Sequence, residues 1–255
     1  MREAIRLIPL DDFPLVEPGQ DIAEIIIACL KKNELILLEN DVLVVAQKII
    51  SKAEGRYVRL NDVLLSIEAI QLAEKTDKDP RHMELVLQES NEILRASPGV
   101  VIVEHRNGYV HANAGIDKSN IPNSKDDPWV LLLPENPDMS ARKLADALRE
   151  NSGINIAVII NDSAGRAWRN GTVGIAIGTA GLNPLYNQIG EKDLFGNILE
   201  VTESAVADEL AAAASLVMGQ AAEACPVVLV RGLKLQSFEL GSGSLIRDKA
   251  RDLFR

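Results

Sequence analysis

Hydrophobic positions along this chain recur with two periods, one typical of helices and one typical of strands. In residues 21–32 the apolar side chains fall at helical spacing, and Asp21 stands where a helix can be capped. Asp79-Pro80 starts a second predicted helix, because proline in the first turn gives up no helical hydrogen bond. Further helices are predicted over residues 138–151 with Asp138 or Ser140 as the cap, over the alanine-rich residues 202–218, and in LIRDKARDLFR as a short docking helix.

Other segments read as strands. Residues 42–47 (VLVVAQ) are apolar almost continuously, which is typical of a strand buried on both faces. Residues 100–104 and 109–113 are joined through Asn107-Gly108, a pair that tolerates positive φ and predicts a hairpin. More strands are predicted over residues 5–10, 129–133, 154–160, 171–178 and 225–232. Helices and strands mix without strict alternation, so we expect an α+β fold with mixed sheets and flanking helices rather than a regular doubly wound sheet.

Composition and charge narrow the functional classes. The chain has 255 residues, of which 47% are hydrophobic and 25% charged, enough for one large domain or two closely packed ones. Its formal net charge is −10, which disfavours nucleic acid as a partner because nucleic-acid binders normally carry a basic face. An acidic protein that binds an anionic substrate needs local Lys or Arg side chains or metal ions.

The compartment follows from the cysteines and from the apolar runs. Cys29 and Cys225 sit in apolar runs without partners at metal-ligand spacing, so we expect buried, reduced thiols and a cytoplasmic protein. The N-terminus has no apolar signal core, and no apolar run approaches the ~20 residues that span a bilayer. The histidines at 82, 105 and 111 are scattered, so a zinc site is not expected.

Two polar stretches carry the chemistry: HANAGIDKSN at residues 111–120 and IINDSAGRAWRNG at residues 159–171. They place Asp117 and Asp162 beside predicted strand ends among small residues, and Ser163 adds a hydroxyl. Carboxylate oxygens suit Mg²⁺ or Mn²⁺, which bridge one or two carboxylates to substrate phosphates. Each aspartate alone is better explained as a turn cap, but the repeated arrangement favours a metal site.

Further candidates each have a plainer alternative. Lys52 follows a buried strand and could neutralise a phosphate, although a lone lysine is more often a solvated surface group. Asn113 and Asn120 flank Asp117 and could position a phosphate or a base, or simply form turns. Gln220 ends the alanine-rich helix and offers a carbonyl oxygen, yet composition alone makes it an ordinary helix-terminal residue.

The segment after Asp162 offers cationic and aromatic groups. Arg166 and Arg169 could bind phosphate or carboxylate in bidentate fashion, and Trp168 between them could stack on a ring or pack. The chain lacks a Walker-type loop and a G-x-G-x-x-G after a strand. A nucleotide-using enzyme with this sequence would therefore have an uncommon fold.

The longer motifs resemble one known family. VLVVAQKIISKAEGR, ANAGIDKSN, LLLPENPD, IINDSAGRAWRNGTVG, DLFGNILEVTESAVADELAAAASLVMGQ and PVVLVRGL resemble, in order and over essentially the whole chain, the coenzyme F420-0:L-glutamate ligases, also called F420 γ-glutamyl ligases. The resemblance implies a GTP-dependent ligase that phosphorylates the terminal carboxylate of F420-0. The amino group of L-glutamate then attacks the acyl phosphate, and further glutamates can be γ-linked.

The same resemblance implies an architecture. It indicates an unusual α+β fold assembled as a homodimer with sites near the subunit interface. Residues 1–255 would form one catalytic unit, which two closely packed subdomains could make up. Some relatives carry an added flavin-binding, nitroreductase-like domain, and this chain looks like the form without it.

Residue by residue, the resemblance assigns two divalent ions per site, Mg²⁺ or Mn²⁺, with K⁺ as a further candidate. Asp117 and Asp162 resemble ligands of one ion. Ser163, where the family usually has Thr, and Gln220, where relatives often have Glu, resemble ligands of the second. The neutral amide of Gln220 would hold that ion less tightly. The residues that resemble nucleotide contacts are Phe13, Pro14, Leu15, Val16, Gln47, Lys48, Lys52 and Asn120.

Some assignments stay open. Gln47 and Lys48 stand where many relatives have small hydroxylated residues, and Arg166, Trp168 and Arg169 are candidates for the acceptor pocket. Two alternative functions remain beside the ligase. One is a metal–GTP binding or regulatory protein that has lost catalysis, and the other is a ligase of the same mechanism with another carboxylate acceptor.

Overall fold

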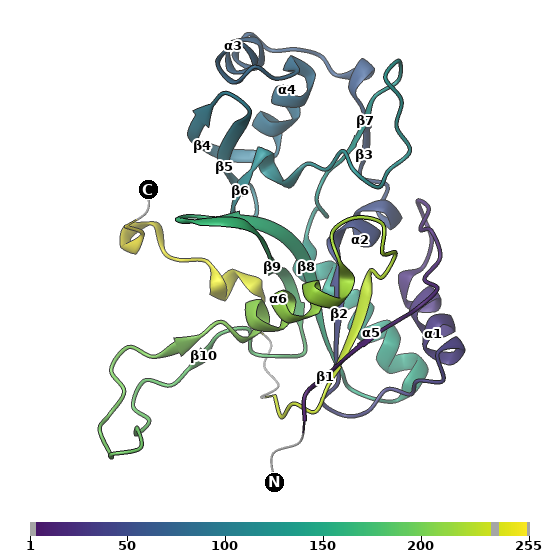
Figure 1. The fold of residues 1–255 in the computed structure, drawn as a ribbon, viewed down its shortest axis with the longest axis vertical. Helices are drawn as coiled ribbons and strands as arrows, with labels where there is room; N and C mark the ends of the chain where they lie inside the picture. The colour runs from purple at the N-terminus through teal and green to yellow at the C-terminus, as the bar shows by residue number, and fades with distance from the viewer. Residues whose placement is uncertain (1–3, 236–239, 254–255) are drawn as a thin grey trace.

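The computed structural model describes residues 4–235 and 240–253, and these form two lobes (Figure 1). The lower lobe is built on a five-stranded sheet in the order β1-β12-β2-β8-β9. Its strands are β1 (Arg6–Pro9), β2 (Val42–Ala46), β8 (Ala157–Arg166), β9 (Arg169–Ala180) and β12 (Val227–Arg231). β2 and β8 run parallel and the other neighbours antiparallel, so the sheet is mixed.

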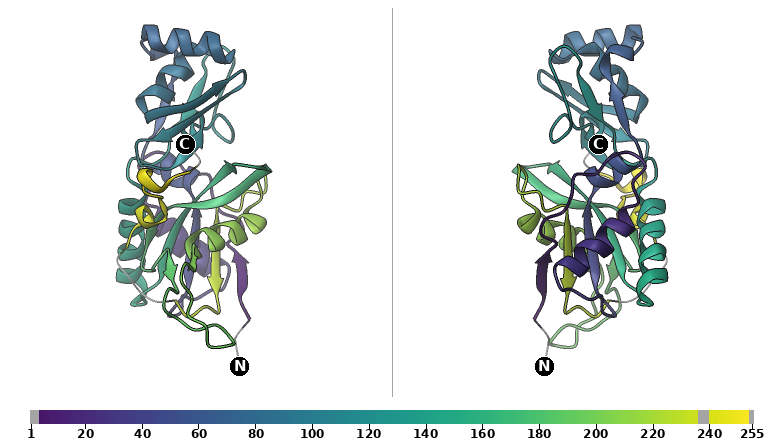
Figure 2. Two further views of the ribbon diagram at one scale, coloured as in Figure 1. Left: turned by 90° about the vertical axis from the view of Figure 1, so that its left-hand side faces the viewer. Right: turned by 90° about the vertical axis from the view of Figure 1, so that its right-hand side faces the viewer.

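Helices cover both faces of this sheet. Figure 2 shows α1 (Ile22–Lys32) and α5 (Pro137–Ser152) on one side and α6 (Val206–Met218) on the other. Along β2, Leu43 and Val45 join the core under α1 and α5, whereas Val42 and Val44 join the core under α6. All four are buried, which explains why the strand is apolar continuously rather than alternately. At its end the chain enters α2 (Gln47–Ala53) without a loop.

The upper lobe has its own core of apolar side chains, centred on Met83, Val101 and Val103. Its elements are η1 (Leu60–Asp62), α3 (Ile67–Thr76), α4 (Pro80–Gln88), a β4-β5-β6 sheet of Ser90–Ser97, Val100–His105 and Val110–Ala112, η2 (Asn113–Gly115), and a two-stranded sheet of β3 (Tyr57–Arg59) and β7 (Trp129–Leu131). β6 contacts β8 of the lower lobe, so the two lobes meet beside the strand that carries Asp162.

Three segments extend from the lower lobe. The β8–β9 hairpin projects beyond the sheet, and a separate arm runs out through the short strands β10 (Tyr186–Asn187) and β11 (Glu203–Ser204) (Figure 1). The last described residues form two 3₁₀ turns, Ser242–Leu245 and Lys249–Arg251. None of the helices in the described ranges is long and apolar enough to cross a membrane.

Most predicted elements are confirmed, as is an α+β fold with mixed sheets and flanking helices. Asp21 accepts hydrogen bonds from Ala23 N and Glu24 N as the cap of α1, and Asp79 caps α4 just before its proline. The hairpin through Asn107-Gly108 pairs β5 with β6 in antiparallel register. Both cysteines are free thiols, Cys29 buried and Cys225 half-buried.

Four predictions of local structure were wrong. The helix predicted over residues 202–218 begins only at Val206, because Glu203–Ser204 pair with β10 as the strand β11. The cap of α5 is Asn136, and Asp138 instead accepts from the backbone N–H of Thr179 and Ser242. The strand predicted over residues 154–160 begins at Ala157 and runs through Asp162 to Arg166, because pairing with β9 continues past the apolar run. Residues 245–253 form a 3₁₀ turn rather than a docking helix, and residues 254–255 lie outside the described ones.

Candidate active site

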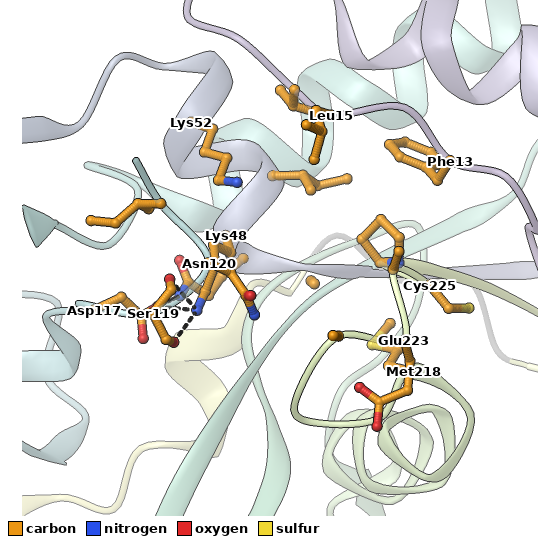
Figure 3. Close-up of a pocket in the computed structure, with 18 of the residues that line it drawn as sticks. Phe13, Leu15, Lys48, Lys52, Asp117, Ser119, Asn120, Met218, Glu223 and Cys225 are labelled. Atoms are coloured by element: carbon orange, nitrogen blue, oxygen red, sulfur yellow. Dashed lines mark hydrogen bonds and ion pairs between the residues drawn. The ribbon is translucent and has the colours of Figure 1, made fainter. Parts of the chain in front are cut away.

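A cavity of about 1260 Å³ lies between the lobes (Figure 3). Its walls come from residues 13–18, the first part of α2, the segment after η2, the middle of β8 and the loop after α6. All the residues that the family resemblance assigns to metal or nucleotide line it, namely Phe13, Pro14, Leu15, Val16, Gln47, Lys48, Lys52, Asp117, Asn120, Asp162, Ser163 and Gln220. These residues are far apart in the sequence, so the fold brings the predicted set together.

The two aspartates approach each other from different lobes. Asp117 follows η2 in the upper lobe, and two 2.9 Å backbone hydrogen bonds to Leu131 fix its position. Asp162 lies within β8 and is largely buried, with a side chain 13% exposed. Burial, followed by the neighbouring Asp117 carboxylate, raises the pKa of Asp162 to about 7. A cation bound between the two carboxylates would offset their repulsion and stabilise their ionised forms.

The second predicted ligand pair is also in contact. The Ser163 hydroxyl donates a 2.8 Å hydrogen bond to Oε1 of Gln220, which joins β8 to the loop after α6. With the aspartates, this makes a set of hard oxygen donors of the kind that Mg²⁺ and Mn²⁺ prefer. Within the described ranges no three His, Cys, Asp or Glu side chains gather around one point. Such an ion would therefore keep positions for water or for substrate phosphates, as Mg²⁺ commonly does.

Side chains of α2 surround the carboxylate of Asp117. Nε2 of Gln47 donates to Asp117 Oδ2 at 2.7 Å, and Nζ of Lys48 lies 3.3 Å from the same oxygen. Lys48 also donates to the hydroxyl of Ser119 at 3.1 Å (Figure 3). Gln47 and Lys48, predicted as nucleotide contacts, thus contact a predicted metal ligand in the structure.

Lys52 lies one turn after Lys48 on α2, and its surroundings differ from those of Lys48. Its ammonium group points into the cavity (Figure 3), and the side chain forms no ion pair with any described residue. Burial and the neighbouring Lys48 lower its pKa. Lys52 is only 9% exposed, so the surface-lysine alternative does not hold, and an ammonium group without an ion-pair partner among the described residues is suited to bind an anion.

The other nucleotide candidates also line the cavity. Nδ2 of Asn120 donates a 2.9 Å hydrogen bond to the carbonyl of Ala221, which links the upper lobe to the loop after α6. Phe13 and Val16 are buried, whereas Leu15 is 86% exposed at the cavity rim. Asn113, by contrast, has a positive φ of 52° in η2 and does not line the cavity, which matches its turn alternative.

Arg166, Trp168 and Arg169 lie elsewhere. They form the exposed tip of the β8–β9 hairpin and do not line the cavity. Arg166 donates to the carbonyl of Gly171 within the hairpin, and Trp168 has a positive φ of 65° at its turn. Their role in binding the acceptor stays a prediction.

Sequence reasoning missed His111. Nδ1 of this histidine lies 3.5 Å from Oδ2 of Asp162, and the residue is 4% exposed. His111 opens the stretch that contains Asp117, which was a usable signal. The scatter of the three histidines along the chain obscured it. Ser119, Glu223 and Cys225 also line the cavity without having been predicted.

Comparison with known proteins gives one consistent result. The model of the family F420-0:Gamma-glutamyl ligase matches residues 12–232. A coenzyme F420:L-glutamate ligase of Methanothermobacter thermautotrophicus is 47% identical over 253 residues, which cover 98% of this chain and 99% of that protein. Proteins of the same name are 44% identical in Methanopyrus kandleri, over 98% of both chains, and 44% identical in Methanocaldococcus jannaschii, over 85% of both chains.

Proposed function

The chain belongs to the F420-0:gamma-glutamyl ligase family, and from this premise we propose that it is a GTP-dependent ligase joining L-glutamate to coenzyme F420-0. It would then extend the product with γ-linked glutamates. The observation that carries the proposal is the single cavity in which Asp117 and Asp162 meet Ser163, Gln220 and Lys52. These side chains could bind metal ions and a polyphosphate, which is what a reaction between a polyphosphate and a carboxylate needs.

The reaction has two displacements. A carboxylate oxygen of F420-0 attacks the γ-phosphorus of GTP, an O–P bond forms, and GDP leaves. The amino nitrogen of L-glutamate then attacks the acyl carbon, a C–N bond forms, inorganic phosphate leaves, and the nitrogen loses a proton. The first step brings an anion to a polyanion, so its cost is largely electrostatic.

Divalent ions, Mg²⁺ or Mn²⁺ at two positions with K⁺ as a further candidate, would offset this repulsion and orient the γ-phosphoryl group. Asp117 and Asp162 would hold one ion, and Ser163 with Gln220 the other. Lys52 neutralises a phosphate of the nucleotide as a point charge. Gln47 and Lys48 hold the Asp117 carboxylate in place. Asn120 and residues 13–16 would form the wall for the nucleoside.

We also propose a homodimer. The arm that contains β10 and β11 exposes Leu194, Phe195 and Val201 almost completely, and large apolar side chains gathered on one projection are typical of a protein interface. A second copy of the chain would cover them. The free cysteines fit the reducing cytoplasm, which is the proposed compartment.

Mass spectrometry of the reaction products tests the function. The purified protein with GTP, F420-0, L-glutamate and Mn²⁺ should yield F420 extended by glutamate, and omission of any one component should abolish the product. GTP-dependent thermal stabilisation without product would favour the regulatory alternative. Product with a different carboxylate acceptor but none with F420-0 would favour the alternative ligase.

A further inference from the structure

His111 lies beside one of the two carboxylates, that of Asp162. It belongs to β6 of the upper lobe, the strand that contacts β8. Its Nδ1 is 3.5 Å from Oδ2 of Asp162, and its side chain is 3% exposed. The imidazole is therefore a buried group of the upper lobe that faces a carboxylate of the lower lobe.

Aromatic packing fixes the plane of this ring. Tyr109 and His111 meet in a T-shaped contact at a centroid distance of 5.2 Å, and Tyr109 in turn stacks on His105 at 5.0 Å. Nδ1 of His105 accepts a 3.0 Å hydrogen bond from the backbone N–H of Asn107, so Nε2 of His105 carries a hydrogen and faces Glu89 at 3.7 Å. The orientation of His105 is thus explained within the upper lobe alone.

His111 differs from His105 at Nδ1, which has no hydrogen-bond partner within the described part of the upper lobe and faces Asp162 instead. Nε2 of His111, like Nε2 of His105, is buried without a hydrogen-bond partner among the described residues. An unpaired buried polar atom costs free energy, and a phenyl ring would fill the same space without that cost. The other ring nitrogen faces Asp162, so the contact that favours an imidazole here is with the metal-site carboxylate.

We propose that His111 is a positioning residue for the metal site, with its Nδ1–H directed at Oδ2 of Asp162. The inference rests on the proposed function, because it presumes that Asp162 binds a divalent ion. Hydrogen bonds to ligating carboxylates fix their orientation, and loss of such a partner commonly weakens metal binding about 10- to 100-fold. Because β6 belongs to the upper lobe, the metal site would also depend on how the two lobes meet.

Two substitutions separate positioning from packing. His111→Phe keeps the ring volume and removes the donor, whereas His111→Asn keeps an N–H near the place of Nδ1 and loses volume. His82→Phe is the matched control, because His82 is also buried with both nitrogens unpaired, and its charged neighbours are Lys118, Lys78 and Asp79 rather than the site carboxylates. Thermal unfolding of each variant reports on packing.

The readout is the affinity for Mn²⁺ in the presence of GDP, measured from the electron paramagnetic resonance signal of free Mn²⁺. We expect His111→Phe to weaken binding about 10- to 100-fold, and His111→Asn to restore most of the affinity although it is the less stable variant. His82→Phe should match the wild type. If His111→Asn does not fold, GDP affinity without metal replaces it, and His111→Phe should leave that affinity unchanged.

Three outcomes would overturn the inference. Equal Mn²⁺ affinity of His111→Phe and wild type would refute it while the proposed function stands. Mn²⁺ affinity that follows the unfolding temperature across the variants would assign His111 a packing role. A wild-type protein that binds no Mn²⁺ with GDP would refute the metal site of the proposed function together with the inference.

Discussion

The base and the tip of the β8–β9 hairpin carry two sets of candidate residues only a few positions apart. At the base, Asp162 and Ser163 are enclosed by β6, α2 and the loop after α6, and each has a partner from another part of the chain. At the tip, Arg166 and Arg169 are exposed, and the described hydrogen bond of Arg166 stays within the hairpin.

This difference concerns preorganisation rather than residue type. The base holds its polar groups in place before substrate arrives, whereas the long side chains at the tip lose conformational entropy when they become ordered on binding. Charged groups in a buried place also interact more strongly than the same groups in water. Catalysis should therefore depend far more on the base than on the tip.

Substitution at the base should have the largest effect. Asp162→Asn replaces a carboxylate that would bind the proposed ion with a neutral amide. It should lower kcat on the order of 1000-fold, with the fold retained. Steady-state assays of product formation measure it. Asp146→Asn on α5, where the side chain is about half exposed, is the control and should stay near wild type. An active Asp162→Asn enzyme would show that catalysis does not depend on the base of the hairpin more than on its tip.

The pH dependence of stability should follow from the same carboxyl group. Because the folded pKa of Asp162 is raised to about 7 from 3.8, its contribution to stability is full below pH 3.8 and is lost as pH rises through 7. The metal-free wild type should therefore lose roughly 2–4 kcal/mol more than Asp162→Asn between pH 4.5 and pH 8, measured by urea unfolding in chelator. Parallel curves for the two proteins would show that Asp162 is not protonated in the fold.

The phosphate contact should come next in size. Lys52→Met removes a charge-assisted hydrogen bond to the nucleotide and should raise the KM for GTP about 10- to 100-fold. Lys75→Met, on the exposed face of α3, is the matched control. A changed KM for L-glutamate with an unchanged KM for GTP would place Lys52 at a different substrate.

A substitution at the proposed second-ion site should strengthen metal binding rather than weaken it. Gln220→Glu adds a charge next to the Ser163 hydroxyl and should lower the Mn²⁺ concentration for half-maximal rate about tenfold. Gln220→Leu should move that concentration in the opposite direction. Equal metal requirements in all three proteins would remove Gln220 from the ion's shell.

The smallest effect is expected at the tip. The double substitution Arg166→Ala with Arg169→Ala should raise the KM for F420-0 by no more than about fivefold and leave the KM for GTP unchanged, because exposed charges contribute up to about 1 kcal/mol. A loss comparable with that of Asp162→Asn would show that substrate or a second subunit encloses the tip.

The sequence predicted this hairpin unevenly, for physical reasons. The apolar run at residues 154–160 marks the buried half of β8, but the polar half continues as strand only because β9 pairs with it. Asp162 was expected after a strand and lies inside one. β4 was not predicted, since two register shifts break its alternation, and α3 was not predicted, since its exposed Ile67 and Ile70 blur the amphipathic pattern.

The local motifs singled out Asp117, Asp162 and Ser163, whereas Gln220 became a candidate only through the family resemblance, and the ligand roles of all four stay predictions. The fold places all four along one cavity, although they come from separate segments of the chain. The motifs do not show which segments of the chain lie close together in the fold. The approach of β6 to β8, and with it the place of His111, depends on how the two lobes pack.

The central claim is that Asp117 and Asp162, from different lobes, share one divalent ion at the nucleotide. Crystals grown with Mn²⁺ and GDP would test it through the anomalous scattering of manganese. The account predicts a peak within coordination distance of both carboxylates, at about 2.2 Å from an oxygen of each. A peak that touches neither aspartate, or GDP bound in the cavity without any peak, would contradict it.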